Sequence, residues 1–144
     1  MKQGLRHQIF GTLKWDSGLE WYAGTIDLDG LEAAIYISVD EADDEASLFS
    51  RWGSIYPSLP NHVVAAREFA STELLSLKNG EWLGEGEEQL TATDFASRLI
   101  PESLTLYPDM TSEVIFHAGG MFFGHVVLIS LDASGQCSDA TIAG

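Results

Sequence analysis

Residues 20–39 read EWYAGTIDLDGLEAAIYISV, and this stretch decides the fold class. Its Asp29-Gly30 pair suits the two-residue turn of a β-hairpin, because both central residues of a type I′ turn need a positive φ. Beyond the turn, the apolar residues keep one parity, which is typical of a half-buried antiparallel strand. Residues 9–15 carry a similar, partly alternating pattern. The sequence therefore predicts a three-stranded antiparallel meander over residues 8–39.

Two helices are predicted in the middle of the chain. Apolar residues recur at helical spacing over residues 63–77, where Asn61 can cap the helix and Asn79-Gly80 can stop it. A shorter helix is expected to start at Thr91, because Thr91 followed by Asp94 resembles a capping box.

Three further strands are expected near residues 102–107, 112–118 and 121–131. The last of these is apolar on both parities, which favours a central strand covered on both faces. The order of strands, then helices, then strands predicts an α+β fold. We expect an antiparallel sheet, made of the N-terminal three-stranded meander plus three C-terminal strands, with two helices packed on it. A chain of 144 residues without a repeat or a long linker fits a single domain over residues 1–144.

The charge of the chain favours one kind of partner. Twenty-two Asp and Glu residues against seven Lys and Arg give a formal net charge of −15 at pH 7. Such a field repels nucleic acid and anionic membranes and steers cationic partners toward the protein, although acidity can also serve solubility alone. We therefore expect a basic protein partner, no nucleic acid and no membrane; the oligomeric state stays open.

The N-terminus and the cysteine content bear on localisation. The first residues lack the apolar core of a signal peptide, and Cys137 is a lone cysteine, so no disulfide framework is expected. Both observations predict a soluble, cytoplasmic protein.

Most of the chain also carries a series of aromatic and glycine motifs. In chain order they are Phe10-Gly11-x-Leu13, Trp21-x-Ala23-Gly24, the leucine-rich stretch 68–77 with Lys78-Asn79, Trp82, Leu90-Thr91 to Phe95, Met121-Phe122-Phe123-Gly124-His125 and Ile142-Ala143-Gly144. In this order the chain resembles a bacterial domain-of-unknown-function family of small cytoplasmic proteins. The resemblance implies no catalytic residues. Members of such families are sometimes placed among immunity proteins of bacterial toxin systems.

The four histidines of the chain are candidates for metal ligands and for catalytic groups. None of His7, His62, His117 and His125 forms a short metal-binding spacing. If Gly119-Gly120 were a two-residue turn, His117 and His125 would lie on opposite faces of the sheet, unless a one-residue bulge reversed the register. We expect neither a metal nor a cofactor. His125 is a weak candidate for a general base, and the alternative is a buried structural histidine.

An acidic run follows the meander and comprises Asp40, Glu41, Asp43, Asp44 and Glu45. It lacks the alternating ligand spacing, the central Gly and the closing Glu of a calcium loop, and so does Glu85-Gly86-Glu87-Glu88. Solvated loops are the simplest interpretation of both segments. If they converge in space, they form one anionic patch, and Trp52 is either core packing or an aromatic anchor beside it.

These observations lead to three hypotheses. The leading one is a protein-binding module, such as an immunity-type inhibitor of a basic toxin or nuclease, with the acidic run and Trp52 as its partner-binding surface. The alternatives are a small hydrolase-like enzyme with a site centred on His125, and a housekeeping module that self-associates through an exposed strand edge. An enzyme is the less expected of these classes, because no nucleophile motif or phosphate loop is present.

Overall fold

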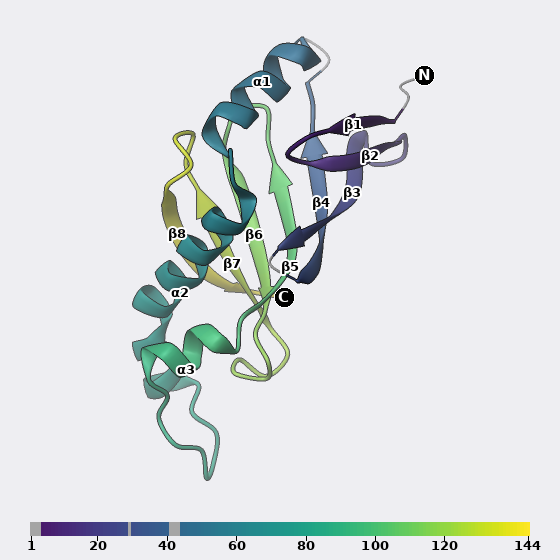
Figure 1. Cartoon of the computed structure of the whole chain (residues 1–144). Coiled ribbons are helices and arrows are strands. Elements are labelled where there is room, and N and C mark those ends of the chain that lie inside the picture. The colour runs from purple at the N-terminus through teal and green to yellow at the C-terminus, as the bar shows by residue number, and fades with distance from the viewer. Residues whose placement is uncertain (1–3, 29, 41–43) are drawn as a thin grey trace.

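The computed structural model describes residues 4–28, 30–40 and 44–144, which form one twisted sheet of eight strands with three helices on one face (Figure 1). In chain order the elements are β1 (Leu5–His7), β2 (Gly11–Asp16), β3 (Trp21–Leu28), β4 (Leu31–Ser38), α1 (Glu45–Ile55), α2 (Leu59–Glu81), α3 (Ala92–Ser97), β5 (Ile100–Leu106), β6 (Ser112–His117), β7 (Val126–Leu131) and β8 (Cys137–Ala143).

The strands lie in the sheet in the same order as in the chain, from β1 to β8. Every neighbouring pair is antiparallel except β4 and β5, which run parallel with Ala34 opposite Ser103 and Ile37 opposite Leu106. Parallel neighbours need a long crossover between them, and α1, α2 and α3 supply it. The helices therefore join two four-stranded meanders into one sheet.

The predicted α+β class and the first meander are confirmed. β2, β3 and β4 pair in sequence, and Leu28 opposite Leu31 leaves the predicted two-residue connection between them. Asp29 lies outside the described residues, whereas Gly30 has the positive φ of 89° that such a turn requires.

The expected arrangement of the remaining elements needs correction. The described residues form a single eight-stranded sheet with three helices, instead of two groups of three strands with two helices. The short strand β1, the helix α1 and the last strand β8 were not predicted. The long helix also starts at Leu59, after Ser58, and it continues through Asn79-Gly80 to Glu81.

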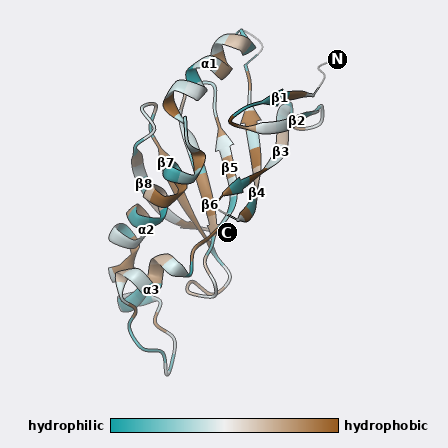
Figure 2. Cartoon of the chain, viewed as in Figure 1, coloured by the Kyte–Doolittle hydropathy of each residue, from teal (hydrophilic) through white to brown (hydrophobic). Residues whose placement is uncertain are grey.

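The core lies between the helices and the facing side of the sheet. Alternate residues of the central strands are buried there, and Figure 2 shows hydrophobic residues along β4, β6 and β7. These buried residues are Ile35, Ile37, Leu104, Leu106, Val114, Phe116, Val127 and Ile129. Helix α2 contributes a stripe of buried residues at helical spacing, namely Val63, Ala66, Ala70, Leu74 and Lys78. The stripe thus ends in a lysine.

The expected strand over residues 121–131 is half wrong. β6 ends at His117 and β7 begins only at Val126, so residues 118–125 connect the two strands, with Phe116 paired to Val127. Successive turns shape this connection, since Met121 N donates to Ala118 O and His125 N donates to Phe122 O. Gly119-Gly120 is therefore not a two-residue turn, and the predicted register of His117 and His125 does not apply.

Candidate functional site

The second-half motifs of the sequence meet around one tryptophan. Trp82 follows α2 directly, and its ring centroid lies 5.5 Å from that of Phe122, 5.7 Å from that of Phe123 and 5.6 Å from that of His125. Segments some forty residues apart in the sequence therefore build one cluster. We call Trp82, Phe123 and His125 the aromatic knob.

The loop before β7 buries two of its residues and exposes the third. Met121 is 1% exposed and Phe122 is fully buried, with its ring edge-to-face against Phe95 of α3 at 6.0 Å. Phe123, by contrast, is 63% exposed. Its φ of 53° and the φ of 93° at Gly124 place two successive residues in the left-handed region. The left-handed backbone costs a residue such as Phe about 1 kcal/mol, and strain of this kind gathers at functional sites.

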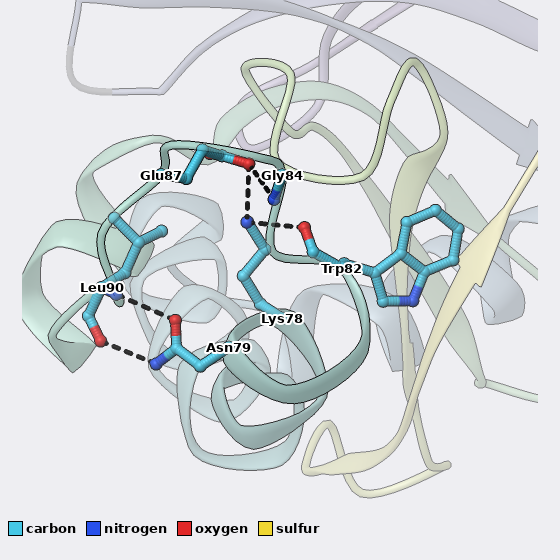
Figure 3. Close-up of polar contacts among 6 residues, drawn as sticks. All are labelled: Lys78, Asn79, Trp82, Gly84, Glu87 and Leu90. Atoms are coloured by element: carbon cyan, nitrogen blue, oxygen red, sulfur yellow. Dashed lines mark hydrogen bonds and ion pairs between the residues drawn. The ribbon is translucent and has the colours of Figure 1, made fainter.

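A buried lysine holds the loop that carries Trp82. The side chain of Lys78 is fully buried, and its Nζ donates a hydrogen bond of 2.8 Å to the carbonyl oxygen of Trp82. The same nitrogen lies 3.6 Å from Oε1 of Glu87, which also accepts a hydrogen bond from the amide of Gly84 (Figure 3). The positive charge of Lys78 is thus satisfied inside the loop.

The next residue of α2 holds the far end of the same loop. Asn79 Nδ2 donates to the carbonyl oxygen of Leu90 at 2.9 Å, and the amide of Leu90 donates to Asn79 Oδ1 at 2.8 Å. This pairing lets α2 run past Asn79-Gly80, where the sequence predicted its end. Figure 3 shows the indole of Trp82 directed away from Lys78 and Asn79. The two clamps position the loop and leave the Trp82 ring to the aromatic knob.

The loop that carries Trp82 is acidic. Glu81, Glu85 and Glu88 are exposed, and residues 81–90 contain no Lys or Arg. The carboxylates of this loop attract cationic groups, and the faces of aromatic rings such as those of Trp82 and Phe123 also attract positive charge.

The structure places the predicted acidic run at the other end of the molecule. Asp40 is exposed, and so is Asp44, which precedes α1. Glu45 accepts a hydrogen bond of 2.8 Å from the hydroxyl of Tyr22, and Glu41 and Asp43 lie outside the described residues. Figure 1 shows the start of α1 and the loop after α2 at opposite ends. Among the described residues, the two acidic segments therefore do not converge.

Trp52 belongs to the core and not to a partner surface. Its side chain is fully buried, and Nε1 donates a hydrogen bond of 3.0 Å to the carbonyl oxygen of Tyr107. The choice that the sequence left open is thus decided for packing. Phe123 was missed because the strand expected over residues 121–131 was predicted to be covered on both faces, which would bury each of its apolar side chains. The only signal in the sequence was its membership of the same motif series as Trp82.

His125 lies half-buried at the edge of the aromatic knob, with its ring edge-to-face against Trp82 at an interplanar angle of 75°. Over residues 4–28, 30–40 and 44–144, no group of three or more His, Cys, Asp or Glu side chains is arranged to hold a metal ion. In the same ranges, no helix has the length and apolarity needed to cross a membrane.

Fold and surface together define a two-layer α+β protein that presents an aromatic knob on two loops at the end of its longest helix. The family model described as "Uncharacterized protein conserved in bacteria (DUF2262)" matches residues 7–142, and the chain belongs to this bacterial family. This finding confirms the resemblance to a bacterial domain of unknown function. No curated protein and no solved structure matches the chain.

Proposed function

We propose that this protein binds another protein and that the aromatic knob is the anchor of the interface. One observation carries the proposal: Phe123 is 63% exposed in a left-handed backbone while its ring packs on Trp82. A few aromatic residues supply most of the binding energy in many interfaces. The Lys78 and Asn79 clamps support the same role, because a held loop loses less conformational entropy on binding.

The partner in this proposal presents a basic surface to the aromatic knob. The net charge of −15 and the exposed Glu81, Glu85 and Glu88 favour cationic groups, and opposite charges raise the association rate. An immunity-type inhibitor of a basic toxin or nuclease fits this chemistry, since its carboxylates would take the place of substrate phosphates. Such an inhibitor would act in the cytoplasm by covering its target at a one-to-one ratio.

The acidic run has a secondary part in this proposal. Asp40 and Asp44 are exposed at the far end of the molecule, where they add to the field that steers a cationic partner. Glu41, Asp43 and Glu45 belong to the same segment of sequence. Neutralising Asp40 and Asp44 should slow association, whereas removing the Phe123 ring should speed dissociation.

The test starts from a partner captured from a bacterial lysate and continues with the purified pair. Phe123→Ser should weaken the affinity about tenfold or more, as expected for an aromatic anchor. Leu19→Ser is the matched control, because Leu19 is 62% exposed but lies in the β2–β3 turn, and it should bind like the wild type. Equal affinities of Phe123→Ser and the wild type would reject the aromatic knob as the interface.

A further inference from the structure

A second surface feature lies at the end of the molecule away from the aromatic knob, between β1 and α1. It is an open hollow of about 360 Å³, which we call the β1–α1 hollow. Its polar lining residues are Arg6, His7, Gln8, Ser50 and Ser54. None of the described residues that line it is acidic, although the chain carries 22 Asp and Glu residues. The hollow thus offers hydrogen-bond donors and one positive charge in a strongly negative protein.

The ring of His7, which lines this hollow, is fixed in its plane and its tautomer. Its ring lies between those of Phe10 and Phe49, with centroid distances of 4.7 and 5.5 Å and interplanar angles of 22° and 30°. Nδ1 accepts a hydrogen bond of 3.1 Å from the amide of Ile9, so the proton of the neutral ring resides on Nε2. The stacking fixes the ring plane, and the backbone bond fixes the tautomer. His7 therefore presents an N–H group in a defined direction.

The apolar part of the lining centres on a glycine inside a helix. Gly53 lies in α1 with Ile9 and Phe49 beside it in the lining. A glycine within a helix costs about 1 kcal/mol relative to alanine, and its φ is outside the left-handed region here. A Cβ at this position would lie 3.5 Å from Cδ1 of Ile9, so the glycine keeps the space open. Ser50 and Ser54, one helical turn apart, lie on the same side of α1.

We propose that the β1–α1 hollow binds a small organic anion. Its anionic head would accept hydrogen bonds from Nε2 of His7 and the hydroxyls of Ser50 and Ser54, with Arg6 supplying the positive charge. Its apolar body would lie on Ile9 and Phe49 over Gly53. A lining of neutral donors, one cation and a small apolar area fits a carboxylate or phosphate ester better than a cation or a sugar. This site is separate from the aromatic knob and does not depend on the proposed protein partner.

The test is an NMR titration of the isotope-labelled full chain with four probes. Benzoate and phenyl phosphate carry both the head and the body, inorganic phosphate carries only a head, and benzyl alcohol has no charge. We expect saturable shifts at the amides of Gly53 and Ser54 and at the His7 ring with benzoate, phenyl phosphate or both. The probe that binds more tightly shows whether the site prefers a carboxylate or a phosphate ester as the anionic head. No saturable shift with either anion, or equal shifts with benzyl alcohol, would overturn the proposal.

Two variants test whether the shifts report this hollow. Arg6→Gln should weaken binding of the preferred anion about tenfold, as expected for a charge-assisted contact. Gly53→Ala should weaken it by filling the hollow, while the protein stays folded because alanine favours the helix. Gly80→Ala is the matched control: it makes the same change in α2, where a Cβ meets no atom within 4 Å, and it should bind like the wild type. Unchanged affinity in both Arg6→Gln and Gly53→Ala would overturn the assignment.

Discussion

The Nζ of Lys78 donates a hydrogen bond of 2.8 Å to the carbonyl oxygen of Trp82, although the lysine side chain is fully buried. A positive charge near the C-terminus of a helix is favourable, because the last carbonyl groups carry partial negative charge. Burial of a charge is costly unless it is paired, and Glu87 supplies the opposite charge at 3.6 Å. Lys78 therefore links the end of α2, the loop after it and the position of the Trp82 ring.

Removing the charge of Glu87 should destabilise the protein more than removing both charges. Glu87→Gln keeps an acceptor for Gly84 but leaves the Lys78 ammonium without its counter-charge. Since Glu87 is 38% exposed, water reduces the loss to about 1 kcal/mol of unfolding free energy. Adding Lys78→Met to Glu87→Gln should recover most of that loss. Urea unfolding of the single and double variants measures it.

Glu88→Gln is the control for this comparison, because the neighbouring Glu88 is exposed. This variant should have the same free energy of unfolding as the wild type. The prediction would be contradicted if the double variant lost as much unfolding free energy as Glu87→Gln and Lys78→Met lose together. That result would mean that Lys78 acts through its packing and its bond to Trp82, without electrostatic coupling to Glu87.

The left-handed backbone at Phe123 should lower the stability of the protein, whereas the exposed Phe123 ring should favour binding of the partner. Both Phe123→Ala and Phe123→Gly remove the exposed ring, but only glycine relieves the φ of 53°. Phe123→Gly should therefore unfold with a free energy about 1 kcal/mol higher than Phe123→Ala. Both variants should lose the partner to the same extent. Equal stabilities of the two variants would show that the left-handed conformation costs little here.

Local patterns in the sequence predicted some elements of this fold, whereas other elements have no clear local pattern. The first meander was predictable because Asp29-Gly30 and strict alternation act within a few residues. β8 was missed because Cys137–Ala143 is an edge strand of mixed polarity, and α1 because Gly53 and three serines interrupt its helical pattern. Pairing between β4 and β5 depends on contacts across some seventy residues, and no local signal specifies it.

The candidate site was concealed for a similar reason. Met121, Phe122 and Phe123 are all apolar, and only the turns of their loop decide that the third is exposed. Lys78 has an apolar position in the stripe of α2, and its partner Glu87 lies nine residues further on, outside helical spacing. The motif segments can be recognised in the sequence, but the packing of the folded chain decides which of their side chains are exposed.

The hydroxyl of Tyr22 should titrate far above the usual range. Burial, followed by the hydrogen bond and the negative charge of Glu45, raises its pKa from the usual 10.0 to about 12. A group with a raised pKa in the folded state contributes stability below pH 10 that is lost between pH 10 and about 12. Phenolate absorbance of the wild type minus Tyr22→Phe measures the pKa. Glu45→Gln should lower it only in part, because burial is the larger cause; a return to 10 would contradict this.

His7 should make the protein sensitive to mild acid. Burial lowers the pKa of His7 below its usual value of 6.5, and protonation of Nδ1 would also break its bond to the amide of Ile9. With a lowered pKa in the folded state, the unfolded chain binds the proton first. The contribution of His7 to stability is therefore complete above pH 6.5 and falls as the pH drops from there through the lower folded value.

Urea unfolding of the wild type and of His7→Phe at a series of pH values tests this expectation. Phenylalanine keeps a ring between Phe10 and Phe49 but cannot bind a proton. The difference between the two free energies of unfolding should therefore be constant above pH 6.5, and the wild type should lose stability relative to His7→Phe as the pH falls below 6.5. Hydrogen bonds from Thr111 and Ser134 lower the pKa values of Asp109 and Asp132 below the usual 3.8. The contribution of these two carboxyl groups to stability therefore changes with pH only below about pH 3.8. The pH range in which these two aspartates titrate is separate from the range below pH 6.5 that is measured for His7. A constant difference between wild type and His7→Phe across this range would show that His7 contributes through stacking alone.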